Sequence, residues 1–307
     1  MWHEIIARGR TSFARAYAGW LRVCSRFAPR RLSQVHLARR IKVIAHRGAS
    51  HLAPENTLAA VNLAWEHGAD IVEVDVHLTK DGRIVAIHDP TTERTAGAGL
   101  EVAKTHSRHL RRLDVGSHKH EDFTGETIPF LEEVLDTIPA GRHLFIEIKC
   151  GPEILAVLSE VLAQSGKRSQ VAIIGFDLQT MKAAKQVMPD IPAHWLCDKK
   201  LWRPFSRSLA KTAKEHGLDG MSIHWSGVTW RFAQAMRRAG LKLYAWTVDH
   251  PADASRLHAM GVDGITTNRP GWLRRHFLAH HSRGKTPQCG PRARRQTGSV
   301  KREMGGD

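Results

Sequence analysis

The chain of 307 residues lacks the marks of several protein classes. Cysteine is scarce and scattered, and no two cysteines form a CxxC pair; the four are Cys24, Cys150, Cys197 and Cys289. Such spacing gives no sign of a disulfide framework or a cysteine zinc site, and it suits a reducing compartment. The sequence also contains no run of 18 apolar residues, so we expect no transmembrane helix.

The first residues lack the apolar centre of a secretory signal, because arginines interrupt them at Arg8, Arg10, Arg15 and Arg22. We therefore predict a cytoplasmic protein, peripheral at the inner face of the membrane if its first 40 residues bind lipid.

Acidic residues are sparse at the two ends of the chain. The net charge of +16 divides into +9 for residues 1–42, +5 for residues 281–307 and only +2 for residues 43–280. The isoelectric point of about 10.2 therefore describes the ends rather than the centre. It gives no ground for expecting a specific nucleic-acid partner.

The central region alternates short apolar runs with amphipathic segments. The apolar runs cover residues 41–46, 69–78, 83–88, 143–149, 170–176, 191–197, 220–225, 241–248 and 264–267. Helix-like segments lie between most of them, and many open with Thr, Ser, Asp or Pro and close with Gly, as capped helices do. Repeated strand–helix units with continuous apolar strands indicate a parallel sheet. They predict a closed α/β (β/α)8 TIM barrel with 83–88 as an extra strand, and an open doubly wound sheet is the alternative.

Residues 90–128 break this alternation, because they are polar and contain glycine, histidine and arginine. We interpret them as a small insertion after the second strand pair of a barrel that covers residues 41–280. Residues 1–40 then form a basic amphipathic extension, and residues 281–307 form a basic, disordered tail.

Histidines and carboxylates gather at the ends of the first predicted strands. Glu73 and Asp75 are two apart in an apolar run, so a strand would point both to one face, where a cation must offset their repulsion. His46 and His88 each close an apolar run. One such residue would fit a satisfied polar group in the core, whereas the whole set indicates a shared site.

The ordered set of motifs resembles the glycerophosphodiester phosphodiesterase family over roughly residues 41–275. The matching residues are His46-Arg47-Gly48, Pro54-Glu55-Asn56-Thr57, Glu73-x-Asp75, His88-Asp89, FIEIK at 145–149 and YAWTVD at 244–249. The resemblance implies a TIM barrel with the insertion above its mouth. It also implies that His46 and His88 are the acid and base, and that Glu73, Asp75 and Glu147 bind a divalent cation.

The chemistry of phosphodiester hydrolysis suits these residue types. Carboxylates are hard oxygen ligands for Mg²⁺ or Ca²⁺, and Arg47 and Lys149 would hold phosphate oxygens. Imidazole titrates near working pH, so the two histidines suit acid–base catalysis. The sequence does not indicate which histidine is the acid and which is the base. Glu55 either orients His46 or Arg47 without touching the substrate, or is an acid at the N-terminus of a helix. Trp246 either forms an apolar wall beside the substrate's alcohol or belongs to the barrel core.

The chain departs from the family at one position. The family commonly has Asp in a TD-x-P pattern near the last strand, where this chain has Thr267-Asn268-Arg269-Pro270. Asn can replace an Asp that fixes a loop, whereas the loss of a charge would alter activity or specificity.

We therefore predict a metal-dependent enzyme that hydrolyses glycerophosphodiesters, small molecules, to an alcohol and glycerol 3-phosphate. Hydrolysis of lysophospholipids, as by a lysophospholipase D, is the alternative within this class. A non-catalytic barrel that binds membrane or nucleic acid is the alternative outside it. For residues 1–40 a helix on an anionic membrane competes with a helix packed on the barrel, a nucleic-acid arm and a disordered extension.

Overall fold

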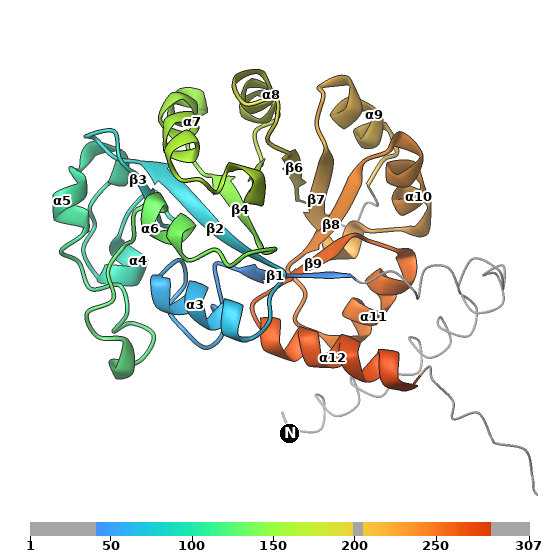
Figure 1. Cartoon of the computed structure of the whole chain (residues 1–307), viewed down its shortest axis with the longest axis horizontal. Coiled ribbons are helices and arrows are strands. Elements are labelled where there is room, and N and C mark those ends of the chain that lie inside the picture. Colours follow the sequence, from blue (N-terminus) through green and yellow to red (C-terminus); the bar gives the residue numbers. More distant parts are fainter. Residues whose placement is uncertain (1–40, 199–204, 284–307) are drawn as a thin grey trace, which may run out of the picture.

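Eight parallel strands close into a barrel in the computed structural model, which describes residues 41–198 and 205–283 (Figure 1). Within these residues β1 pairs with both β9 and β2, which joins the two ends of the sheet. The barrel strands are β1 (Lys42–His46), β2 (Ile71–Leu78), β4 (His143–Ile148), β5 (Val171–Gly175), β6 (Ala193–Cys197), β7 (Gly220–His224), β8 (Lys242–Trp246) and β9 (Gly264–Thr267). The prediction of a TIM barrel rather than an open sheet is confirmed.

A helix follows each barrel strand, directly or after the insertion. The helices are α3 (Leu58–Glu66), α6 (Leu131–Asp136), α7 (Leu155–Gln164), α8 (Leu178–Val187), α9 (Ser208–Glu215), α10 (Trp230–Ala239), α11 (Pro251–Met260) and α12 (Pro270–Arg283). Three short 3₁₀ turns, η3 (Pro152–Ile154), η4 (Arg168–Gln170) and η5 (Trp225–Gly227), lie between them.

Local sequence accounts for many of the helix ends. The side chains of Thr57, Asp177 and Thr229 accept hydrogen bonds from the first turns of α3, α8 and α10. Gly240 and Gly261 end α10 and α11 in the left-handed conformation. The helix α12 was missing from the predicted segments and continues past residue 280, where we expected the barrel to end. Pro270 at its start was the available signal.

The strand β3 (Ile84–Ala86) is the expected extra strand, and it runs antiparallel to β2 at the edge of the sheet. After it come the short helices α4 (Glu93–Ala96), η1 (Val102–Lys104), α5 (Ser107–Leu110) and η2 (Glu121–Phe123). Figure 1 shows α4 and α5 gathered beside β3, at the left of the view. These segments have their own small core, formed by Val85, Ile87, Val102, Leu110, Val115 and Ile128.

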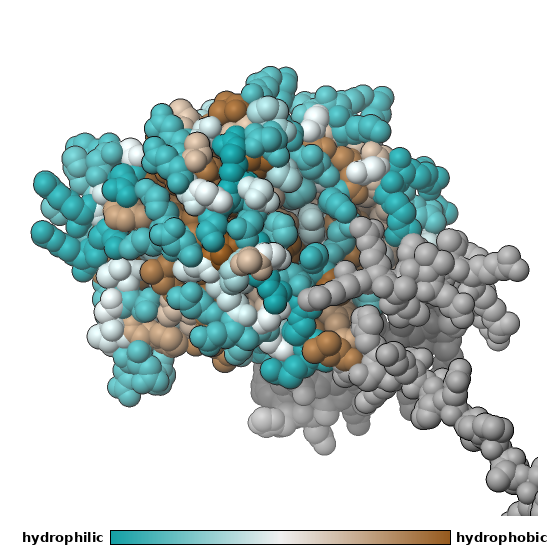
Figure 2. All heavy atoms as spheres, viewed as in Figure 1, coloured by the Kyte–Doolittle hydropathy of each residue, from teal (hydrophilic) through white to brown (hydrophobic). Residues whose placement is uncertain are grey.

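Two apolar layers hold the barrel together. The larger lies between the strands and the surrounding helices, and the smaller fills the barrel interior with side chains such as Ile44, Phe145 and Tyr244. On the face visible in Figure 2 hydrophilic residues predominate, and apolar ones are confined to small areas. Among helices of the described residues, none has the length and apolar character needed to cross a bilayer.

The basic extension at residues 1–40 and the tail from residue 284 lie outside the described residues. The interpretations made for them from charge and composition therefore stay predictions.

The first prediction concerns Gly48, where β1 turns toward α3. Its φ is +79°, and a Cβ there would lie 2.5 Å from the backbone carbon of Ala60. Left-handed strain of about 1–2 kcal/mol then adds to overpacking of about 1–3 kcal/mol. We expect Gly48→Ala to lower the free energy of unfolding in urea by about 2–5 kcal/mol.

Gly82→Ala is the matched control, because Gly82 has a similar φ of +73° but no atom within 4 Å of a Cβ. Gly82→Ala should lower the free energy of unfolding only by the backbone strain of about 1–2 kcal/mol. Equal losses in the two variants would contradict the close packing of β1 against α3.

Candidate active site

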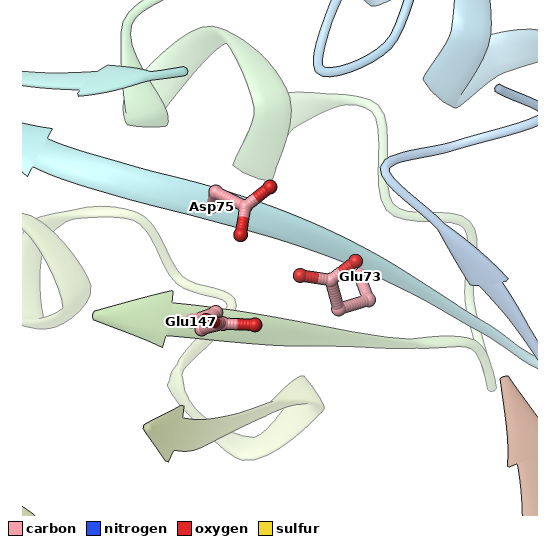
Figure 3. Close-up of side chains that lie close together, drawn as sticks. All are labelled: Glu73, Asp75 and Glu147. Atoms are coloured by element: carbon pink, nitrogen blue, oxygen red, sulfur yellow. The ribbon is translucent and has the colours of Figure 1, made fainter. Parts of the chain in front are cut away.

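Three carboxylates meet on the adjacent strands β2 and β4, where Glu73 is level with His46 at the carboxyl end of β1. Figure 3 shows Glu73 and Asp75 on β2 pointing toward Glu147 on β4. Asp75 and Glu147 are register partners, and one oxygen from each of the three residues lies within 4.8 Å of the others. Residues two apart on a strand share a face, so the sequence spacing accounts for this convergence.

All three side chains are buried, with exposed fractions of 2%, 0% and 7%. Burial and the neighbouring carboxylates raise the pKa of Glu73 well above its usual range, and burial and Asp75 raise that of Glu147 to about 7. Oε1 of Glu73 and Oδ1 of Asp75 are buried without a hydrogen-bond partner. Unpaired carboxylate oxygens that face one another fit a divalent cation such as Mg²⁺ or Ca²⁺.

Arg47 lies over the carboxylates at the end of β1. Its backbone N–H donates to Glu73 at 2.9 Å, and the residue adopts a left-handed φ of 54°, which is uncommon outside glycine. Its guanidinium lies 3.0 Å from Asp75 and 2.9 Å from Glu55. Burial would lower the pKa of Arg47, but these carboxylates outweigh it and raise the pKa.

Glu55 lies behind Arg47, away from the carboxylate cluster. Its Oε1 also accepts a 2.6 Å hydrogen bond from Arg94, in the insertion. Burial alone would raise the pKa of Glu55, but the two arginines hold it at about 2. Glu55 thus contacts both Arg47 and Arg94, and its role in orienting Arg47 stays a prediction.

His46 closes β1 and contacts Asn268, just beyond β9. Its Nδ1 lies 2.8 Å from Oδ1 of Asn268, whose amide nitrogen donates to Asp249 at 2.6 Å. Because this orientation turns the amide oxygen toward the ring, Nδ1 is the donor and Nε2 can accept a proton. Burial and the charge of Arg47 lower the pKa of His46.

His88 follows β3, which is not one of the barrel strands. We expected it to close the extra strand, and it follows the end of β3, which runs antiparallel to β2 and returns from Leu78 toward Asp75. Its Nδ1 lies 2.6 Å from Asp89, and its Nε2 lies 3.1 Å from the ammonium of Lys149.

Lys149 connects His88 with the carboxylates. Its Nζ lies 2.8 Å from Glu147 and 3.6 Å from Asp75. Burial would lower the pKa of Lys149, but these two negative charges raise it. The lysine therefore stays charged at the edge of the cluster.

A cavity of about 110 Å³ joins these groups at the barrel mouth. Its apolar side comes from Ile174, Phe176, Leu196 and Trp246. The residues of its polar side are His46, Arg47, Glu73, His88, Glu147, Lys149, Ser222 and Thr266. Trp246 packs edge-to-face on Phe176, and its indole N–H donates to the carbonyl of Ser222. Trp246 thus lines the cavity and also packs on the apolar interior of the barrel, and its role as a wall for the substrate stays a prediction.

A larger cavity of about 800 Å³ lies at the opposite end of the barrel and includes none of the predicted site residues. Because TIM-barrel active sites form at the carboxyl ends of the strands, the smaller cavity is the candidate active site.

Three residues of the site were absent from the predicted set. Asn56 exchanges two hydrogen bonds with Asp75, through its side-chain amide and the Asp75 backbone. Asp89 pairs with His88, and Arg94 pairs with both Asp89 and Glu55. Asn56 and Asp89 stand beside predicted residues in the sequence, whereas nothing local distinguishes Arg94 from the other arginines.

Comparison with known proteins agrees with this geometry. The family model "Glycerophosphoryl diester phosphodiesterase family" matches residues 46–272. A glycerophosphodiester phosphodiesterase of Caldanaerobacter subterraneus is 35% identical over 238 residues, which cover 75% of this chain and 95% of the relative. One of Bacillus subtilis is 30% identical, with 75% of this chain and 84% of the relative covered.

A solved structure shows the same architecture. An Oleispira antarctica phosphodiesterase, in complex with the product sn-glycerol-3-phosphate, is 30% identical to this chain with a TM-score of 0.72. The match covers 77% of this chain and 96% of the other. The resemblance inferred from the motifs is confirmed, and the chain belongs to the glycerophosphoryl diester phosphodiesterase family.

Proposed function

We propose that this chain is a metal-dependent glycerophosphodiester phosphodiesterase that releases an alcohol and glycerol 3-phosphate. Family membership supports the reaction class. The observation that carries the proposal is one cavity lined by carboxylates, two histidines, an arginine and a lysine. This is the set that charge neutralisation and proton transfer at a phosphodiester require.

Glu73, Asp75 and Glu147 would hold the divalent cation, because their oxygens converge and those of Glu73 and Asp75 include buried ones without hydrogen-bond partners. When bound, such a cation neutralises charge on phosphoryl oxygens and polarises the phosphorus centre. The neighbouring Arg47 and Lys149 supply two further positive charges at the cavity wall. Arg47 is held by three carboxylates, so it presents a fixed orientation to an anionic substrate.

His46 and His88 would move the protons. A neutral His46, with its Nδ1 proton given to Asn268, can accept a proton at Nε2. His88 has a carboxylate at Nδ1 and an ammonium at Nε2, so its environment differs from that of His46. Two imidazoles with different partners suit the separate tasks of activating the nucleophile and protonating the leaving alkoxide.

The relatives bear on the substrate. Two that are 35% and 30% identical to this chain are named glycerophosphodiester phosphodiesterases, which supports a deacylated glycerophosphodiester more than a lysophospholipid. A non-catalytic role is not favoured, because every predicted acid, base and ligand side chain is present at one site.

The second prediction is dependence on a divalent cation. Chelation should abolish turnover of a glycerophosphodiester, and Mg²⁺, Ca²⁺ or Mn²⁺ should restore it. Glu73→Gln, Asp75→Asn and Glu147→Gln should each lower kcat/KM by about 10² or more, because the metal supplies several kcal/mol of charge stabilisation. Full activity in excess chelator, without metal by elemental analysis, would contradict the proposed site.

Stability supplies a readout independent of activity. Because the pKa of Glu147 is raised to about 7 in the folded protein, folding of the chelated protein should favour the protonated carboxyl. Stability should therefore fall as pH rises from about 5 to 8. Added metal should restore it at the higher pH, and Glu147→Gln should flatten the pH dependence.

The third prediction concerns the histidines. His46→Ala and His88→Ala should each lower kcat by about 10²–10⁴ with smaller effects on KM. The pH profile of kcat/KM should be bell-shaped and should lose one limb in each variant. A change in kcat of less than about threefold would remove that histidine from the mechanism.

Asn268→Asp refines this test. A carboxylate beside Nδ1 would stabilise the imidazolium and raise the pKa of His46, which burial now lowers. The limb that requires neutral His46 should therefore move to higher pH, by about one unit or more. That limb should be absent in His46→Ala/Asn268→Asp, as it is in His46→Ala, because the ring that titrates is gone.

The fourth prediction follows from the basic extension. We propose that residues 1–40 bind anionic membranes, since each basic residue near such a surface contributes about 1 kcal/mol. A chain truncated to start at Arg40 should lose salt-sensitive sedimentation with anionic vesicles and keep turnover of a soluble glycerophosphodiester. Equal vesicle binding by both chains would refute membrane recruitment, and unfolding would assign the extension to the barrel's own structure.

A further inference from the structure

Arg94 lies in the insertion, outside the set of residues that line the cavity, yet it touches partners of two of them. We propose that Arg94 is a positioning residue that ties the phosphate-binding arginine and the catalytic histidine into one arrangement. The proposal rests on the function proposed above for Arg47 and His88.

The contacts of Arg94 form a bridge. Its Nη2 donates to Oε1 of Glu55 at 2.6 Å, and the same oxygen accepts from Arg47 at 2.9 Å. Its Nε donates to Oδ2 of Asp89 at 2.5 Å, while Oδ1 of Asp89 lies 2.6 Å from Nδ1 of His88. One guanidinium therefore joins the loop after β1 to the segment after β3.

Both carboxylates have a second task, which separates this network from a simple surface ion pair. Each accepts from Arg94 on one side and from a cavity residue on the other. Burial would raise the pKa of Asp89, but its hydrogen bonds to Arg94 and His88 lower it, so the carboxylate stays ionised. An exposed pair in isolation contributes little, whereas a shared network restrains every group in it.

The backbone of Arg94 is itself anchored. Thr92, which precedes α4, and Thr95, within it, are both buried, and Ala96 packs on the small core of the insertion. The guanidinium reaches from this support to the site, with 47% of the side chain exposed. The geometry thus gives the insertion a defined role, which is to set the position of Glu55 and Asp89.

Two roles follow for Arg94. It holds the Asp89 carboxylate in the orientation that accepts from Nδ1 of His88, so the ring presents Nε2 to the cavity. It also offsets part of the negative charge of Glu55. The positive electrostatic potential that Arg47 offers to an anionic substrate is therefore larger. Lysine cannot reproduce both contacts, because a single ammonium lacks the planar fork of a guanidinium.

The fifth prediction compares Arg94→Met with Arg168→Met in the full chain loaded with metal. Arg168 makes a two-contact pair with Asp190 at 2.7 and 2.8 Å, and it is a partly exposed arginine away from the cavity. We expect Arg94→Met to lower kcat about 10- to 100-fold, the range typical of supporting residues behind a site, with a smaller rise in KM. Arg168→Met should stay within about twofold, and Arg94→Lys should fall between.

A double-mutant cycle tests the route of the effect. In a Glu55→Gln/Asp89→Asn background, Arg94→Met should lower kcat by less than about threefold, because both contacts that transmit its effect are weakened. A further tenfold loss in that background, or a wild-type kcat in Arg94→Met alone, would overturn the proposal. If Arg94→Met does not fold, Arg94→Lys carries the same comparison.

An NMR measurement separates this proposal from the proposed function, since it needs no substrate. The Nδ1 proton of His88, identified by its loss in His88→Ala, should exchange slowly in the wild type and in Arg168→Met. It should exchange faster in Arg94→Met and Arg94→Lys. His88 also contacts Lys149 through its ring and His77 through its backbone carbonyl, which lies 3.1 Å from the His77 ring. Because Arg94 touches neither contact, Lys149 and His77 should keep their resonances in the Arg94 variants. Unchanged exchange would refute positioning, whatever the activity.

Discussion

Repulsion among three buried carboxylates is the constraint around which the site is organised. Glu73, Asp75 and Glu147 converge on adjacent strands, where little solvent screens them. Their charges must be offset, and Arg47 does so at Asp75 while Lys149 does so at Glu147 and Asp75. A divalent cation would complete the balance, because two carboxylate oxygens still lack hydrogen-bond partners.

The supporting residues follow from that balance. The guanidinium of Arg47 must be held where a substrate can also reach it. Glu55 binds Arg47, and Arg94 binds Glu55 in turn. The histidines are fixed in the same manner, His46 by Asn268 and Asp249, and His88 by Asp89. The insertion contributes to both sides through Arg94, and its Lys119 also donates to the carbonyl of Ser50 in the loop after β1.

Much of the fold was predictable from local pattern. Continuous apolar runs separated by capped helices predicted parallel strand–helix units, and period-two spacing placed Glu73 with Asp75, and Glu147 with Lys149, on one face. The prediction was incomplete where local pattern is weak. The helix α12 lacks a strong apolar stripe, and the direction of β3 depends on a tight turn around Gly82 that the apolar run did not specify.

The sequence by itself determined the side chains available for chemistry, the face of each strand they occupy and the family to which the chain belongs. Only the tertiary structure decided which distant groups meet. His46 and Asn268 are 222 residues apart and touch because β1 pairs with β9 when the barrel closes. Arg94 reaches Glu55 across 39 residues because the insertion packs on its own core beside β3. Such contacts depend on closure and packing, which no local spacing encodes.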